Sequence, residues 1–252
     1  MIKLINNCVR DIITIMNKYI VAIGGGEIGQ LKTLKIDKKI VSLTKKKNPN
    51  LLFIPTASDD SQSYIETVEK IYKKKLGCNT DTLLLINEKP TKSEIEKKIF
   101  SADIIYVGGG NTLKMMKLWR RLGIDKMLIS AYNKGTILCG ISAGAICWFQ
   151  YGHSDSMSFY NPNSWDYVRV KGTGILKGTM CPHFNGQTRG IKRKQSFSKM
   201  MQRKGGLGIA IDNCAAIIFC NESLKIINSK KDAKAYTLSK KSKKIITTPI
   251  PS

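Results

Sequence analysis

The chain has 252 residues, enough for one α/β domain or two small ones, and 42% of them are hydrophobic, so a full core can form. Its 42 lysines and arginines outnumber its 18 aspartates and glutamates, and a formal net charge of +24 favours nucleic acid or an anionic membrane as partner. The lysines are nevertheless spread along most of the chain, with no arginine-rich stripe and no recognisable nucleic-acid motif. We therefore interpret them mainly as solvated side chains and expect no specific nucleic-acid partner.

The cysteines predict a reducing compartment, and the hydropathy pattern predicts no membrane-spanning segment. The seven cysteines form no C-x-x-C pair and lie mostly in apolar runs, which predicts free buried thiols rather than disulfides or a zinc site. No apolar run approaches the length of a transmembrane helix, and Met1–Met16 lacks an uninterrupted signal-peptide core. We expect a cytoplasmic protein without membrane, metal or cofactor, with one domain over residues 1–252 and a candidate N-terminal extension at residues 1–17.

The first part of the chain alternates apolar runs with helical patterns. The predicted strands are Tyr19–Ile23, Leu51–Ile54, Thr82–Ile86, Asp103–Val107 and Thr136–Cys139. The predicted helices are Leu31–Lys45, Ser61–Lys75, Ser93–Phe100 (with Ser93 as N-cap and Glu96 completing a capping box), residues 112–121 and Ile124–Asn133. This alternation implies right-handed crossovers and a doubly wound, mostly parallel sheet, which binds ligands at the carboxyl ends of its strands.

After residue 150 the sequence becomes more polar. Tyr151–Gly178 is typical of loops and short antiparallel strands that frame a cleft, and Arg189–Arg203 predicts a basic helix. Ala215–Cys220 and Ser223–Asn228 predict a hairpin, and Ala235–Leu238 predicts one more strand. The lysine-rich tail, residues 239–252, is expected to be partly disordered.

Two glycine-rich loops follow predicted strands. The first, Gly24–Gly29, contains G-x-G-x-x-G, but the acid that a dinucleotide site needs about twenty residues later is missing, so a turn beside a substrate cleft is preferred. The second, Gly108–Gly110, indicates close approach of backbone to a ligand or a tight strand–helix turn. Its candidate contacts are the backbone of Gly109 and Gly110 and the side chain of Asn111.

The stretch from Thr136 to Gln150 contains G-x-S-x-G between an apolar strand and a helix-forming segment. In that context a strained turn exposes the Ser142 hydroxyl at the sheet edge, and the following helix N-terminus can stabilise an oxyanion. A buried serine in a glycine-bearing turn is the plainer alternative. A serine nucleophile needs a base, and of the two histidines His183, after Cys181-Pro182, is preferred to His153, which we place in a mobile loop.

The third member of a triad would orient the imidazole. Asp212 and Asn213 lie at a turn before an apolar strand, which gives the order Ser, His, acid. Asp155 or Asp166 would restore the Ser, acid, His order of the α/β-hydrolases, but the HGGG loop of that fold is absent.

Several motifs in order jointly resemble the peptidase E family, the serine aspartyl dipeptidases that include the cyanophycinases. They are Gly24-Gly25-Gly26-Glu27, Ile54-Pro55-Thr56-Ala57-Ser58, Tyr106-Val107-Gly108-Gly109-Gly110-Asn111-Thr112, Gly140-Ile141-Ser142-Ala143-Gly144-Ala145, His153-Ser154-Asp155 and Cys181-Pro182-His183. The resemblance implies a three-layer α/β sandwich similar to class I glutamine amidotransferases, with a mostly parallel sheet and a C-terminal hairpin. It also implies metal-free hydrolysis of short peptides that begin with aspartate.

The resemblance also assigns roles to residues. Ser142 is the expected nucleophile and His183 the base, and the backbone N–H groups of Gly110 and Ala143 form the expected oxyanion hole. The family's third member aligns with Asn213, where this chain departs from an acid. Asp212, one residue earlier, is slightly preferred because only a carboxylate stabilises imidazolium by charge.

Two further residues are expected to bind substrate. Asp155 matches an acid that the family places after the nucleophile helix, and we assign it to the substrate's amino group. Arg189, in Gly186-Gln187-Thr188-Arg189, resembles the family's arginine, and a guanidinium suits the substrate carboxylate because it binds both oxygens. Arg193 is the second candidate.

The sequence therefore predicts a serine exopeptidase for small acidic peptides, either a monomer or a homodimer. One alternative is a non-catalytic or weakly active binding protein with the triad altered at Asn213. A glutaminase of the amidotransferase type is disfavoured because Ser142 stands where that class has cysteine.

Overall fold

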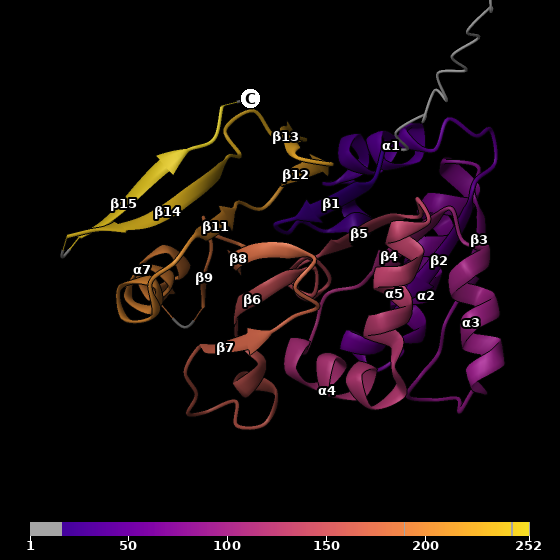
Figure 1. The fold of residues 1–252 in the computed structure, drawn as a ribbon, viewed down its shortest axis with the longest axis horizontal. Coiled ribbons are helices and arrows are strands. Elements are labelled where there is room, and N and C mark those ends of the chain that lie inside the picture. Colours follow the sequence, from indigo (N-terminus) through magenta and orange to yellow (C-terminus); the bar gives the residue numbers. More distant parts are fainter. Residues whose placement is uncertain (1–16, 189, 243, 252) are drawn as a thin grey trace, which may run out of the picture.

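The computed structural model describes residues 17–188, 190–242 and 244–251, and these form two large β-sheets with helices packed around them (Figure 1). The cysteines in this part of the chain are all free, and all except Cys220 are buried. Cys8 and the N-terminal extension up to residue 16 lie outside the described residues. None of the described helices combines the length and apolarity needed to cross a bilayer.

Seven described strands form the central sheet, in the spatial order β13-β12-β1-β5-β4-β2-β3. Their bounds are Tyr19–Ile23 (β1), Asn50–Ile54 (β2), Asn79–Thr82 (β3), Ile104–Val107 (β4), Ile137–Ile141 (β5), Ala215–Cys220 (β12) and Ser223–Asn228 (β13). The strands β1 to β5 pair in parallel, and the β12–β13 hairpin adds an antiparallel edge beside β1. The predicted mostly parallel sheet and C-terminal hairpin are confirmed.

Helices cover both faces of this sheet. On one face lie α1 (Leu34–Leu43), α2 (Gln62–Glu69) and the π-helical turn η3 (Lys70–Lys75) that continues α2. On the other lie α3 (Lys92–Ser101), α4 (Thr112–Leu122) and α5 (Ile124–Asn133). Short 3-10 helices occupy connections at Ile28–Gln30 (η1), Thr56–Ser58 (η2) and Ser156–Phe159 (η4).

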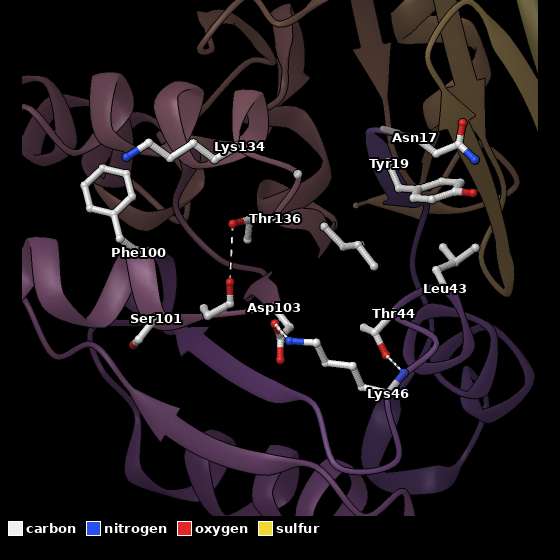
Figure 2. A pocket seen from close by; sticks show the side chains of 13 residues that line it. Asn17, Tyr19, Leu43, Thr44, Lys46, Phe100, Ser101, Asp103, Lys134 and Thr136 are labelled. Carbon is white, nitrogen blue, oxygen red and sulfur yellow. Dashed lines mark hydrogen bonds and ion pairs between the residues drawn. The ribbon is translucent and has the colours of Figure 1, made fainter. Parts of the chain in front are cut away.

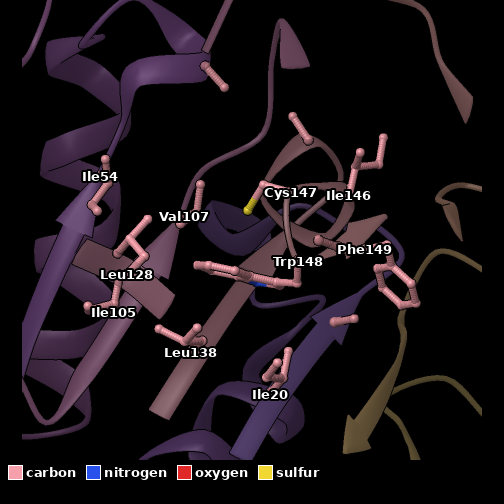
Figure 3. Packing of buried hydrophobic residues seen from close by; sticks show 14 of the residues in the cluster. Ile20, Ile54, Ile105, Val107, Leu128, Leu138, Ile146, Cys147, Trp148 and Phe149 are labelled. Atoms are coloured by element: carbon pink, nitrogen blue, oxygen red, sulfur yellow. The ribbon is translucent and has the colours of Figure 1, made fainter. Parts of the chain in front are cut away.

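The central strands are buried on both faces, which is why they appear in the sequence as unbroken apolar runs. The core on the α3–α5 side continues beneath the second sheet. Figure 3 shows the indole of Trp148 lying among Val107, Leu128 and Leu138, side chains that belong to the central sheet and to α5. One shared apolar core thus joins β5, the strand that precedes Ser142, to the second sheet.

The second sheet has the order β15-β14-β11-β8-β6-β7 within the described chain. Its strands are Phe149–Ser154 (β6), Val168–Lys171 (β7), Leu176–Cys181 (β8), Gly208–Ile211 (β11), Ala235–Lys241 (β14) and Lys244–Pro249 (β15). The small ribbon of β9 (Gln187–Thr188) and β10 (Ile191–Lys192) leads into α7 (Arg193–Lys204). The sequence predicts loops and short antiparallel strands here, whereas β6, β8 and β11 pair in parallel.

Three local predictions are wrong. Residues 83–87 do not continue β3, because the N–H groups of Leu85, Ile86 and Asn87 donate to Asp60 Oδ2 instead of to a neighbouring strand (2.8, 2.6 and 3.1 Å).

The capping box of α3 is made by Thr91 and Glu94, two residues before the predicted pair. The described residues of the lysine-rich tail contain the end of β14 and the strand β15, which pair as a hairpin instead of being disordered. Lysine on an exposed edge strand discourages pairing with other chains.

Candidate active site

Ser142 occupies a sharp turn between β5 and the short helix α6 (Ala143–Ile146). Its backbone is strained, with φ 55° and ψ −112°, in a region that side chains other than glycine rarely adopt. The turn needs glycine on both sides, as the sequence predicts. A Cβ on Gly140 would lie 2.4 Å from Gly144 O, and a Cβ on Gly144 would lie 2.0 Å from Val107 O. The strain and the two glycines together hold the hydroxyl at the carboxyl edge of the sheet.

The helix after Ser142 is shorter than predicted. It ends at Ile146, and the chain enters β6 three residues later. The Thr173 N–H and hydroxyl both bind the carbonyl of Cys147 (2.7 and 2.8 Å), which draws the chain into the second sheet. One helical turn still leaves the Ala143 N–H without an intrahelical acceptor, as at every helix start.

His183 lies two residues after the end of β8 and reaches Ser142 from the second sheet. Its Nε2 is 2.8 Å from Ser142 Oγ, and its Nδ1 is 2.6 Å from Asn213 Oδ1. An amide oxygen only accepts, so Nδ1 carries the proton and Nε2 presents its lone pair to the hydroxyl. The backbone of His183 also has positive φ (51°), and its N–H donates to Gly24 O (2.9 Å).

The imidazole partner is Asn213, and the preference for Asp212 is wrong for this structure. Asp212 and Asn213 follow β11 at a turn, and only the side chain of Asn213 hydrogen-bonds His183. Asp212 Oδ2 accepts the Lys234 N–H (3.0 Å), while the Asn213 N–H donates to Asn185 Oδ1 (2.9 Å). Burial raises the pKa of Asp212, and its carboxyl group holds the β14 segment.

The first glycine loop makes room for this pair. A Cβ on Gly25 would lie 2.1 Å from Asn213 Oδ1 and 2.3 Å from His183 Nδ1, so any side chain there would displace the hydrogen bond. A Cβ on Gly24 would lie 2.3 Å from the carbonyl oxygen of Asp212. The sequence predicts a turn beside a cleft at this loop. The structure adds that the absence of a side chain at Gly25 leaves room for His183 and Asn213.

The second glycine loop lies on the other side of Ser142. A Cβ on Gly109 would be 3.4 Å from Ser142 Cβ, and the Gly109 N–H donates to the hydroxyl of Tyr64 (3.4 Å). Gly110 has φ 136°, and a Cβ there would lie 2.0 Å from Ala57 O. The sequence did not single out Tyr64, because its contact with the loop arises only from packing.

Asn111, which the sequence predicts as a substrate contact, is buried and has a structural role. Its Oδ1 accepts the Lys114 N–H (3.0 Å) and caps α4.

Asp155 and Arg193 form an ion pair near the imidazole. Arg193 Nη1 is 2.9 Å from Asp155 Oδ2, and the guanidinium is almost fully buried whereas the carboxylate is about one-third exposed. Asp155 therefore remains partly open to solvent, while Arg193 is held by the protein itself. Arg189 lies outside the described residues.

His183 is neutral at physiological pH. Burial lowers its pKa, the nearby Arg193 guanidinium lowers it further, and the Asn213 hydrogen bond and the Asp155 carboxylate act in the opposite direction. A neutral imidazole is the form that accepts a proton from serine.

His153 belongs to β6 and is fully buried, so the expected mobile loop is wrong. It stacks on Tyr167 (centroids 4.1 Å apart), and its Nε2 is 3.0 Å from Ser196 Oγ. Its Nδ1 faces the thiol of Cys181 at 3.6 Å. Burial lowers the pKa of His153 and raises that of Cys181 to about 12, so both groups are neutral.

The α/β-hydrolase arrangement is not adopted. Asn213 occupies the Nδ1 position that Asp155 or Asp166 would need, and Asp155 binds Arg193 instead. In the described residues no group of three or more His, Cys, Asp or Glu side chains could hold a metal ion.

A cavity of about 740 Å³ opens beside His183 and Asn213. A second cavity, of about 320 Å³, lies at the amino ends of β1, β4 and β5, the sheet edge opposite Ser142 (Figure 2). Both lysines of this cavity have partners within it: Lys46 pairs with Asp103 at 2.7 Å, and the ammonium of Lys134 lies over the ring of Phe100. The catalytic candidates therefore gather at only one of these two edges.

Comparison with known proteins identifies the family of the chain. The model of peptidase family S51 matches residues 13–227, so the chain belongs to this family, which is the peptidase E family. The chain is 35% identical over 237 residues to "Uncharacterized peptidase YgaJ" of Bacillus subtilis (strain 168), covering 93% of this chain and 97% of that protein. It is 29% identical over 87 residues to Peptidase E of Citrobacter koseri, covering 34% of this chain and 36% of that one.

Solved structures share the fold. The structure named "1.5A Crystal Structure of a Putative Peptidase E Protein from Listeria monocytogenes EGD-e" has a TM-score of 0.65 at 19% identity, covering 84% of this chain and 98% of that one. A peptidase from an acI-B1 Actinobacterium has a TM-score of 0.66 at 20% identity, covering 94% and 98%. The predicted family and fold class are confirmed, and family membership supports a peptidase function.

Proposed function

We propose that this chain is a serine-type exopeptidase that hydrolyses dipeptides or short peptides with an N-terminal aspartate. The observation that carries the proposal is the relay of Ser142 Oγ, His183 Nε2, His183 Nδ1 and Asn213 Oδ1, with contacts of 2.8 and 2.6 Å. Both hydrogen bonds lie within the range that proton transfer requires.

In the first half-reaction Ser142 Oγ attacks the scissile carbonyl carbon, and His183 Nε2 takes the hydroxyl proton. The N–H groups of Gly110 and Ala143 are the proposed donors to the oxyanion. Gly110 belongs to the loop that approaches Ser142 at Gly109, and Ala143 is the first residue of α6, directly after Ser142. Collapse of the tetrahedral intermediate breaks the C–N bond, and the Nε2 proton passes to the leaving amine.

In the second half-reaction the acyl-enzyme is hydrolysed. Water gives a proton to His183 Nε2 and attacks the ester carbonyl, and Ser142 leaves with the returned proton. Asn213 keeps the imidazole in one tautomer throughout but adds no charge to stabilise imidazolium, so the proposed enzyme is slower than one with a carboxylate at this position.

Selectivity for aspartate follows from charges beside the relay. The exposed side of the Asp155 carboxylate suits the substrate's α-ammonium group. Arg193 is already paired with Asp155, which leaves Arg189 as the proposed partner of the substrate side chain.

The test is hydrolysis of a panel of Asp-Leu, Glu-Leu, Asn-Leu and Ala-Leu, with Ser142→Ala as the inactive control. Turnover of Asp-Leu alone, lost in the variant, supports the proposal. Turnover of the other dipeptides at equal rates contradicts the specificity for aspartate.

Because Asn213 is neutral, a peptide-binding protein of low or no activity is the second candidate. A folded protein that binds Asp-Leu but does not label with a covalent serine probe would favour this candidate.

A further inference from the structure

The strand order determines where the leaving group of a bound peptide lies. β4 with the Gly108–Gly110 loop flanks β5 on one side, and β1 with the Gly24–Gly26 loop flanks it on the other. The oxyanion faces the β4 side, and the leaving amine must face His183, which protonates it. Because the His183 N–H binds Gly24 O, the imidazole lies at the β1 loop. The leaving group therefore points toward that loop.

The cavity of about 740 Å³ occupies this side. Its lining includes both relay residues, His183 and Asn213, together with Gly26 and Glu27 from the β1 loop. Lys32 and Lys230 complete the rim. The space exceeds what one amino-acid residue fills, so size alone does not limit the length of the leaving group.

The charges on the rim are available to a ligand. Lys32, Lys230 and Glu27 are exposed, and none of them makes an ion pair with another described residue. The hydroxyl of Ser229 donates to the carbonyl oxygen of Lys32, which ties the two lysine-bearing segments together. Two ammonium groups against one carboxylate leave an excess of positive charge, which favours an anionic group at this end of the cavity.

We propose that this cavity is the leaving-group subsite and that Lys32 and Lys230 recognise the free α-carboxylate of the released residue. The inference rests on the proposed peptidase function. In a dipeptide that carboxylate directly follows the scissile bond, whereas in a longer or C-terminally amidated peptide an uncharged amide replaces it. The chain therefore prefers dipeptides because their carboxylate is attracted by the two lysines, and not because the cavity is too small for a longer leaving group.

The experiment compares kcat/KM for Asp-Leu and for Asp-Leu amide. The variants are Lys32→Gln, Lys230→Gln and their combination, with Lys225→Gln, an exposed lysine on β13 outside the cavity, as the matched control. Because exposed ion pairs contribute little individually, each lysine is expected to account for about a two- to fivefold preference for the free acid. The preference should fall at high salt and in the double variant, and persist in Lys225→Gln.

Two results would contradict the proposed subsite alone, and a third would also contradict the proposed peptidase function. Equal kcat/KM for the two substrates in the unmodified protein, or an unchanged ratio in the double variant, removes the subsite but leaves the peptidase intact. Absence of turnover on both substrates contradicts the proposed function itself, and the subsite with it.

Discussion

The molecule contains two serine–histidine pairs of similar geometry, and only one of them has the surroundings of an active site. His183 Nε2 lies 2.8 Å from Ser142 Oγ, and His153 Nε2 lies 3.0 Å from Ser196 Oγ. His153 is fully buried and His183 is partly buried, and for both the pKa is lowered by burial and then by Arg193. A hydrogen bond between serine and histidine therefore does not define a catalytic site.

The difference lies in what surrounds each pair. Ser142 sits on a strained turn at the end of a parallel strand, beside a helix start and a glycine loop, whereas Ser196 lies within α7. The second nitrogen of His183 meets an amide oxygen at 2.6 Å, whereas that of His153 meets a thiol at 3.6 Å. Backbone strain, oxyanion donors and a fixed tautomer separate the proposed catalytic pair from the structural one.

The largest expected effect on kcat comes from removing the hydroxyl of Ser142, and removal of the Ser196 hydroxyl is its control. Ser142→Ala should lower kcat by more than about 10⁴-fold, because the nucleophile is lost. Ser196→Ala should change kcat by less than about twofold, since it removes only one hydrogen bond within the packed helix. Steady-state hydrolysis of Asp-Leu checks both, with circular dichroism as the folding control, and comparable losses in the two variants would contradict the distinction.

The second prediction tests whether Gly25 must leave room for the imidazole of His183 and for its partner Asn213. Gly25→Ala places a methyl group 2.1 Å from Asn213 Oδ1 and should lower kcat by about 100-fold or more, because a displacement of about 1 Å costs that much. Gly123→Ala is the matched control for a glycine with open space around it, although its positive φ costs some stability. Retained activity in Gly25→Ala would show that the relay does not need the observed geometry.

A smaller effect on kcat is expected from a negative charge at residue 213, the partner of His183 Nδ1. Asn213→Asp should raise kcat by roughly 10- to 100-fold, because a hydrogen bond to a charged group contributes about 1.5–3 kcal/mol. The pKa of His183 is lowered in the folded protein, so the acid limb of kcat/KM should lie below pH 6.5, and the added carboxylate should move it to higher pH. A pH–rate profile of both proteins measures this shift, and a fall in kcat with no shift would contradict the role given to Asn213.

The smallest expected effect is on the pH dependence of the free energy of unfolding, through His153 of the His153–Ser196 pair. The pKa of His153 is well below its usual 6.5 in the folded chain, so the unfolded chain binds the extra proton and the free energy of unfolding falls as pH drops through about 6.5. His153→Gln should flatten this fall between pH 7.5 and 5.5, which thermal unfolding at the two pH values detects. An equally steep fall in the variant would assign the pH dependence to other groups.

The parts of the fold that follow from local chemistry were predictable. The buried parallel strands appear as apolar runs, and the glycines around Ser142 mark the turn, because both patterns depend on neighbours in sequence. The second sheet was largely missed, since β7 and β8 are only about half buried and their pairing depends on distant segments.

The choice between Asp212 and Asn213 could not be made from sequence. Chemistry favours the carboxylate, but the backbone of the turn after β11 decides which of the two side chains meets His183, and the sequence does not give that conformation. The role of Gly25 was hidden for the same reason, because both groups that it accommodates lie more than 150 residues away in the chain.

The central claim, that Ser142 is an activated nucleophile, is tested most directly by covalent labelling with a fluorophosphonate and mass spectrometry of the modified peptide. We predict a single adduct on Ser142 that is absent in Ser142→Ala and unchanged in Ser196→Ala. Absence of any adduct on the folded protein, or labelling that persists in Ser142→Ala, would contradict the account.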